Sequence, residues 1–237
     1  MFGYYSFLNR TDFLFYFIVI VPIILISIVI TIRLKLIYKK FSKISNKNMV
    51  SGAVVARNIL DGYGLNYVEV VAISGELTDH YDPVDNVVRL SYKNYEGTSI
   101  AAIGVAAHEV GHAVQHAKNY VPVKIRSAVI PVTRFGSIFY LPAIIAGFFL
   151  SSFKLVYLGI ALFSLVTFFE FITLPVEFNA SNRAIKILQS QKILNLEEIN
   201  GVKKVLWAAA MTYVVSFVTS LAELIRFILM IRTGDDD

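Results

Sequence analysis

The sequence predicts a mainly α-helical membrane protein with four transmembrane helices and a small antiparallel β-sheet. Three observations lead to this prediction. First, 56% of the 237 residues are hydrophobic and only 16% are charged, whereas a soluble domain contains about 25% charged residues. Second, four apolar segments are each long enough to cross a hydrocarbon core of about 30 Å. Third, short β-prone runs lie between the first and the second of these segments.

Residues 13–32 form the first predicted transmembrane helix, because this segment contains no charged residue. Pro22 lies inside it and no small-residue cleavage site follows, which argues against a cleaved signal peptide. Before the segment, Arg10 is opposed by Asp12. Six basic residues follow the segment: Arg33, Lys35, Lys39, Lys40, Lys43 and Lys47. The positive-inside rule therefore predicts an N-terminus outside the cell and a cytoplasmic location for the chain after residue 32.

Residues 135–153 and 155–176 form the second and third predicted transmembrane helices. The connection between them is so short that the two helices are expected to form a tight hairpin. The fourth predicted helix covers residues 205–222. It is followed by Glu223 and Arg226, which are three residues apart and can pair on one face of a helix.

The region between the first helix and the hairpin has the features of a small folded domain. Apolar spacing predicts a helix over residues 48–62. Thr98 and Ser99 predict the cap of a second helix over residues 100–118. Between the two helices, three β-prone runs separated by turn residues predict an antiparallel sheet, over residues 67–73, 76–81 and 86–92.

These segments predict five consecutive parts. They are an N-terminal transmembrane helix with a basic cytoplasmic flank (1–47), a cytoplasmic region (48–126), a transmembrane hairpin (127–176), a cytoplasmic helix (177–204) and a C-terminal transmembrane helix with an acidic tail (205–237).

The stretch around His108, Glu109 and His112 carries a metal-binding pattern, HEVGH. On a helix, His108 and His112 lie one turn apart on the same face, where two imidazoles can hold one zinc ion. Glu109 then lies beside the metal and can activate a water molecule. The sequence contains no cysteine, so any metal must be held by His, Asp or Glu. The pattern predicts a zincin-like metal helix of a zinc peptidase, although two histidines can also share a helix by chance.

A catalytic zinc site of this kind needs a third protein ligand. His116 lies roughly 12 Å from His108 along the helix axis, so we interpret it as a helix-surface residue or a supporting residue. Glu177 is the better candidate, because two membrane crossings separate it from His112 and return the chain to the cytoplasmic side. The alternative is that Glu177 is an ordinary interfacial carboxylate after Pro175.

Glu170 lies two helical turns before Glu177, inside the third predicted span. An ionisable group in an apolar span is costly and by default marks a functional site. Glu170 can support a metal ligand, or it can pair with an arginine of a neighbouring span such as Arg134 or Arg226. The sequence leaves both roles open.

Three stretches together resemble the bacterial membrane neutral zinc metallopeptidases of the YugP type: residues 77–83, 106–112 and 174–184. The chain is more distantly similar to the HtpX/Ste24 membrane metalloproteases. The resemblance implies His108, His112 and Glu177 as zinc ligands and Glu109 as the general base. The HtpX/Ste24 pattern has an Asp four residues after the ligand Glu, to orient a histidine. Here that position is Ser181, which leaves the orienting role to Ser181, Asn182 or another carboxylate.

Asp79 and His80 belong to the first of these stretches and precede the metal helix. His80 can line the cleft and stabilise the oxyanion formed during peptide hydrolysis. The alternative is a strand end whose Asp82-Pro83 only makes a turn.

The sequence therefore predicts a membrane-embedded metalloendopeptidase with one Zn²⁺ per chain. Its expected location is the bacterial inner membrane, with the active site on the cytoplasmic side. Its expected partners are the lipid bilayer and a peptide or protein substrate that is itself membrane-associated, and no nucleic-acid motif is found. The alternative function is a zinc-containing, non-catalytic membrane scaffold or quality-control partner, against which the intact Glu109 argues. A transporter is disfavoured, because the spans show no paired halves.

Overall fold

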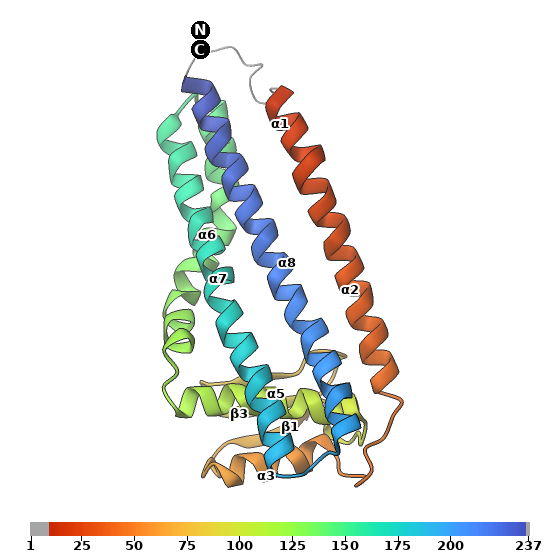
Figure 1. Cartoon of the computed structure of the whole chain (residues 1–237). Helices are drawn as coiled ribbons and strands as arrows, with labels where there is room; N and C mark the ends of the chain where they lie inside the picture. The colour runs from red at the N-terminus through yellow and green to blue at the C-terminus, as the bar shows by residue number, and fades with distance from the viewer. Residues whose placement is uncertain (1–9, 236–237) are drawn as a thin grey trace. The chain divides into compact units, whose positions relative to one another are not determined.

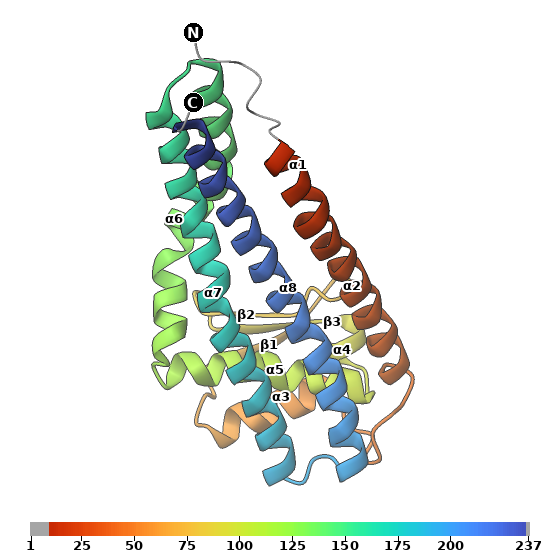
Figure 2. The same ribbon diagram turned by 45° about the horizontal axis from the view of Figure 1, so that its top comes forward.

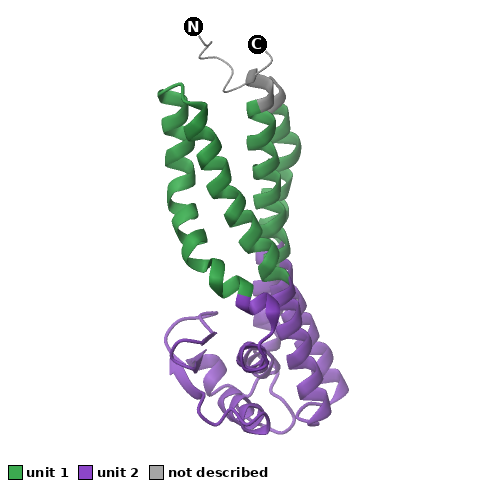
Figure 3. Ribbon diagram, turned by 90° about the vertical axis from the view of Figure 1, so that its left-hand side faces the viewer, with its two compact units in different colours: residues 1–29, 125–174, 212–237 green, residues 30–124, 175–211 purple. Residues whose placement is uncertain are grey.

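The computed structural model describes the backbone of residues 10–235 and the side chains of residues 13–231. The side chains of Arg10, Asp12 and the acidic residues 235–237 lie outside the described part. The described chain divides into two compact units (Figure 3). Unit 1 takes its residues from 1–29, 125–174 and 212–237, and unit 2 from 30–124 and 175–211.

Four helices are long and apolar enough to cross a membrane, as the sequence predicts. The first runs through α1 (Arg10–Phe15), a π-helical turn η2 (Tyr16–Ile20) and α2 (Val21–Phe41). The others are α6 (Val121–Phe149), α7 (Phe153–Ser190) and α8 (Leu196–Asp235), shown in Figure 1. All four extend beyond the predicted apolar segment at one end or both, because a helix needs no apolar residues to propagate outside the hydrocarbon core, whereas α6 ends at Phe149, before the predicted residue 153.

The segment predicted as one cytoplasmic helix, residues 177–204, is instead divided between the end of α7 and the start of α8. Asn195 and Glu198 cause the break by capping α8 reciprocally: the Glu198 N–H donates to Asn195 Oδ1, and the Asn195 N–H donates to Glu198 Oε2. Lys192 in the intervening turn has a φ of 53°, which no helix accommodates. A capping box thus overrides continuous helical patterning.

Unit 1 contains the predicted hairpin, formed by most of α6 and the first part of α7. The helices approach closely where glycines replace side chains, since a Cβ at Gly159 would lie 2.8 Å from the Tyr140 carbonyl oxygen. Glu223 and Arg226 form the ion pair that the sequence predicts, with Nε and Oε2 2.7 Å apart. Glu170 lies near Ser216 of α8 and within the electrostatic influence of Arg126, whereas Arg226 is paired with Glu223.

Unit 2 contains the sheet, whose predicted all-antiparallel arrangement is wrong. The three strands are β1 (Glu69–Ile73), β2 (His80–Asp82) and β3 (Val87–Ser91), in the spatial order β1-β3-β2. β2 and β3 form the expected antiparallel hairpin, but β3 pairs with β1 in parallel. The loop after β1 contains two residues with positive φ, Gly75 and Leu77, and it carries the chain past the position where β3 inserts. β2 therefore becomes a short edge strand.

Helix α5 (Ile100–Ala117) forms the centre of unit 2 (Figure 2). Its small side chains allow α3 (Gly52–Gly62), α7 and α8 to pack against one core. α4 (Tyr92–Tyr95) joins β3 to α5. Residues from all four long elements are fully buried in this core: Ile59, Leu60, Ile103, Val110, Ala184, Leu188 and Val202. The core holds α5 against the last turns of α7, and this contact determines the position of the metal-binding motif.

Candidate metal centre

His108 and His112 project from one face of α5. Ser99 caps this helix as predicted, since its Oγ accepts from the Ala102 N–H. The two imidazole rings lie one turn apart, with centroids separated by 4.8 Å and planes nearly perpendicular. Both side chains are about 15% exposed. The two rings can thus approach a common point that remains accessible to a substrate.

Glu177 of α7 meets these two histidines. Its Oε2 lies 3.3 Å from His108 Nε2 and 3.7 Å from His112 Nε2. In the described part of the chain, these three residues form the group whose ligand atoms could hold a metal ion. A tetrahedron with ligand bonds of about 2.1 Å has edges of about 3.4 Å, so the two distances from Glu177 Oε2 are close to those of a zinc site, and all three donor atoms lie within 4.8 Å of one another. The structure therefore brings together the three residues that the sequence predicts as ligands.

The outer nitrogen of each imidazole is hydrogen-bonded to a neutral side chain. Ser181 Oγ lies 3.2 Å from His108 Nδ1, at the position where the HtpX/Ste24 pattern has its Asp. Gln115 Oε1 lies 3.0 Å from His112 Nδ1. Such contacts at Nδ1 leave Nε2 available for a metal and fix the orientation of each ring.

Gln115 was not recognised in the sequence. Its side chain is fully buried, and its Nε2 donates to the Val176 carbonyl oxygen and to Asn179 Oδ1. These two bonds fix the amide, so that Oε1 must accept from His112 Nδ1–H. The sequence signal that could have identified Gln115 is its position three residues after His112, because residues three apart lie on the same side of a helix.

We expect Gln115→Leu to lower the affinity for zinc by about 10- to 100-fold, the usual cost of removing a hydrogen bond behind a metal-binding histidine. Gln115→Glu, which keeps the acceptor, should retain more of the affinity. Zinc titration of the purified metal-free variants measures both values. Equal affinities in wild type and Gln115→Leu would contradict this role.

Gly111 allows α7 to approach the motif. A Cβ at this position would lie 2.9 Å from the carbonyl oxygen and 3.3 Å from the Cα of Ala180. Both are backbone atoms, which cannot rotate away as a side-chain end can. The glycine of HEVGH is therefore required for the distance between α5 and Glu177.

Gly111→Ala should push α7 away from α5 and so destabilise the fold by about 1–3 kcal/mol, the cost of inserting one methyl group into a packed core. The shift should also weaken zinc binding. Thermal unfolding in detergent, with and without zinc, measures both effects. Gly62→Ala, the same substitution at the exposed last residue of α3, is the control for the change in helix propensity. A Gly111→Ala protein with wild-type stability and zinc affinity would refute the close-packing role.

Glu109 lies on α5 next to the three ligands and is 8% exposed. The backbone N–H of Tyr81 in β2 donates to Glu109 Oε2 over 3.1 Å. The Tyr81 ring packs against His116, with centroids 6.0 Å apart. The edge strand thus fixes the Glu109 carboxylate from one side, a contact that the sequence did not predict.

The remaining predicted site residues lie outside the group of ligands. His116 is exposed at the end of α5, and its pKa is lowered by partial burial and by His112. His80 is exposed and its Nδ1 lies 2.8 Å from the Thr78 carbonyl oxygen. Glu170 belongs to unit 1.

Asp79 is not one of the candidate ligands, and its carboxylate instead makes hydrogen bonds within unit 2. Its carboxylate accepts from the Ser91 N–H at 2.7 Å and from Asn94 Nδ2 at 2.9 Å. Asn94 Oδ1 in turn accepts from the Tyr38 hydroxyl. Asp79 therefore anchors the chain just before β2, which determines where Tyr81 meets Glu109.

The electrostatics of the site favour a bound cation. Burial lowers the pKa of His112, but the hydrogen bond with Glu177 and the negative charges of Glu177 and Glu109 outweigh burial, so the pKa of His112 is raised above its ordinary value. In the metal-free protein, the proton on His112 stabilises the fold in acid, and this contribution is lost as the pH rises through the raised pKa.

Zinc binding should therefore weaken as the pH falls, and the loss should begin above pH ~6.5, the ordinary pKa of histidine. The metal and the proton compete for His112, and the raised pKa favours the proton over a wider pH range. Zinc affinity measured as a function of pH tests this expectation. An affinity that stays constant down to pH ~6.5 would disprove the competition.

Comparisons with known proteins agree with this geometry. Residues 16–232 match the family described as "Putative neutral zinc metallopeptidase". The chain is 47% identical over 205 residues to "Putative membrane protease YugP" of Bacillus subtilis (strain 168), covering 86% of this chain and 91% of the relative. No solved structure matches the chain. With the match extending over nearly all of its length, the chain belongs to the neutral zinc metallopeptidase family.

Proposed function

We propose that this protein is a membrane-embedded zinc metalloendopeptidase that hydrolyses peptide bonds of membrane or membrane-associated proteins at the cytoplasmic face of the bacterial inner membrane. The observation that carries the proposal is the convergence of His108 Nε2, His112 Nε2 and Glu177 Oε2 beside the Glu109 carboxylate. A site that only stabilised the fold would have no need of a fourth, acidic group at this position.

The donor set fits one Zn²⁺, held by His108, His112 and Glu177. When bound, zinc supplies Lewis acidity, which polarises the substrate carbonyl and acidifies water. Glu109 takes the proton from the attacking water and transfers it to the nitrogen of the leaving amine. The Tyr81 N–H keeps the Glu109 carboxylate in place for both transfers.

β2 provides a surface on which an extended substrate can bind. Among the described residues β2 pairs with β3 alone, so its other edge has no strand neighbour there, and the Tyr81 N–H on that edge already donates to Glu109. A peptide can add to the remaining part of such an edge through main-chain hydrogen bonds. Since Tyr81 of this strand contacts Glu109, a peptide on the β2 edge would lie beside the catalytic carboxylate.

The cytoplasmic orientation is supported by the charge distribution around the first span. Unit 2 begins at Ile30, and the basic residues that follow the span all lie in this unit. The positive-inside rule assigns such a flank to the cytoplasm.

The test is chelator-sensitive cleavage by the purified protein in detergent, followed by comparison of membrane proteomes from cells that express wild type or Glu109→Gln. Wild type should cleave, lose activity with a zinc chelator and regain it with added Zn²⁺. Membrane proteins should yield fragments with wild type alone. Stoichiometric zinc without any cleavage, and identical proteomes, would instead indicate the non-catalytic scaffold.

A further inference from the structure

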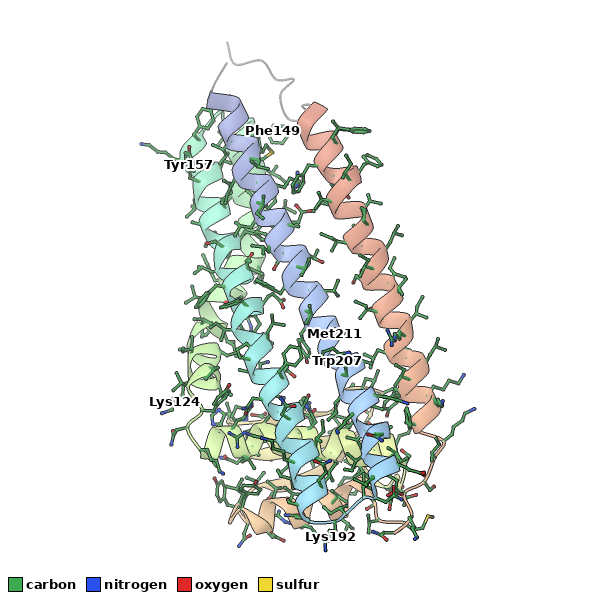
Figure 4. All side chains as sticks on the ribbon, viewed as in Figure 1. Lys124, Phe149, Tyr157, Lys192, Trp207 and Met211 are labelled. Atoms are coloured by element: carbon green, nitrogen blue, oxygen red, sulfur yellow. The ribbon has the colours of Figure 1, made fainter. Side chains whose placement is uncertain are left out.

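Trp207 lies on α8 where the exposed side chains change from charged to apolar. Lys203 and Lys204, one turn earlier, are exposed. Trp207 itself is 60% exposed and is the single tryptophan of the sequence. Figure 4 labels it together with Met211, one turn further along α8. An exposed tryptophan preceded by lysines is the pattern of a helix that enters the membrane interface.

Phe178 connects this position on α8 to the metal centre. Its ring lies against the Trp207 ring, with centroids 6.0 Å apart. Phe178 directly follows Glu177 on α7. The aromatic contact therefore places Trp207 and Glu177 at the same level on two neighbouring helices of unit 2.

α7 gives an independent boundary at the same level. Phe171 is 52% exposed, as a lipid-facing side chain is, whereas Asn182 and Lys186 are exposed polar residues. The change from lipid to water must occur within the stretch between Phe171 and Asn182, about 16 Å of helix at 1.5 Å per residue. Glu177 lies near the middle of this stretch.

We propose that Trp207 and Phe178 anchor unit 2 in the headgroup layer of the cytoplasmic leaflet, so that His108, His112 and Glu177 lie at headgroup depth. Tryptophan prefers this layer because its ring is apolar and its N–H needs a polar partner. Lys203 and Lys204 lie where they can contact anionic lipid headgroups.

This depth defines a substrate class, and this part rests on the proposed function. A site in the headgroup layer meets the few residues by which a membrane protein leaves the bilayer. A fully folded cytoplasmic protein would have to bring its peptide bond into the lipid interface, and a bond at the bilayer centre would lie too deep. The substrate is therefore the juxtamembrane segment of a membrane protein.

Trp207 itself reports the depth without any label. The protein is reconstituted in phosphatidylcholine vesicles that contain phosphatidylglycerol, and its fluorescence is quenched with lipids brominated near the headgroup end or near the methyl end of the acyl chain. Acrylamide serves as the quencher in water. The control is the double variant Trp207→Phe/Tyr63→Trp, which moves the single tryptophan to the end of α3.

We expect Trp207 to lose more fluorescence to the headgroup-end bromines than to the methyl-end bromines, and the control tryptophan to respond to acrylamide alone. Quenching of Trp207 by acrylamide alone, or most strongly by the methyl-end bromines, would overturn the proposed depth. Protection of Trp207 from every quencher that increases with protein concentration would also overturn the proposed depth. That result would mean that a second copy of the chain covers this surface.

A transmembrane peptide with a long unstructured cytoplasmic tail tests the substrate class. Wild type should cut within a few residues of the end of the transmembrane helix, and Glu109→Gln should not cut. Cuts spread evenly along the tail would overturn the substrate class. The absence of any cut would count against the proposed function, whereas the fluorescence result decides the depth on its own.

Discussion

Glu109→Gln is expected to leave the zinc site occupied and to lower the rate of peptide-bond cleavage by about 10²–10⁴-fold, the usual contribution of a general acid–base residue. The amide keeps the size of the carboxylate and can still accept from the Tyr81 N–H, so the position of β2 should not change. It cannot accept the proton of the attacking water. Cleavage rate and zinc content, measured on the same preparation, check both parts of the expectation.

Glu197→Gln is the matched control, since it is the same substitution at an exposed position of α8. It should retain wild-type activity and zinc content. If Glu109→Gln cleaved at the wild-type rate, the assigned role of Glu109 as general base would be wrong. If it lost its zinc as well, the result would show that Glu109 helps to hold the metal.

Glu177→Ala is expected to remove zinc from the purified protein. Its carboxylate is one of the three candidate ligands and has the negative charge that the two histidines lack. The loss in zinc affinity should exceed the roughly 10- to 100-fold cost of removing a group that only supports a ligand. Metal analysis after dialysis at neutral pH measures the zinc that each protein retains.

Lys186→Ala, an exposed position on the same helix, controls for general effects of truncating a side chain of α7. It should retain stoichiometric zinc. Stoichiometric zinc in Glu177→Ala would exclude Glu177 as a ligand and leave the site with two protein donors. Because Glu177 is buried against the core, circular dichroism of the variant is needed to show that the helices are retained.

Several features of this protein follow from local sequence patterns. Length and apolarity identified the four membrane-long helices, because the hydrocarbon core imposes the same requirement on every span. The HEVGH spacing predicted two histidines on one helix face. Counting membrane crossings then singled out Glu177, although it is far from the motif in the sequence. The predicted ligands lie together in the structure, and their binding of zinc remains to be measured.

The sheet shows where local patterns fail. Each strand was located to within a few residues, except that β2 is displaced toward the turn. The pairing of β1 with β3 was not predicted, because alternation along a strand defines its two faces and says nothing about its neighbours. The division of residues 177–204 between two helices was also missed, since it depends on one capping pair rather than on apolar spacing.

The sequence by itself determined the four membrane-long helices and the identity of the candidate ligands, and it predicts the orientation, because these depend on lengths, charges and the period of a helix. Tertiary structure alone decided what surrounds the ligands: Ser181 behind His108, Gln115 behind His112, and the Tyr81 N–H on Glu109. The first and third of these contacts join residues far apart in the chain. The second is local, yet the orientation of the Gln115 amide depends on its bonds to α7. Such contacts follow from how closely helices and strands pack, as Gly111 against Ala180 shows.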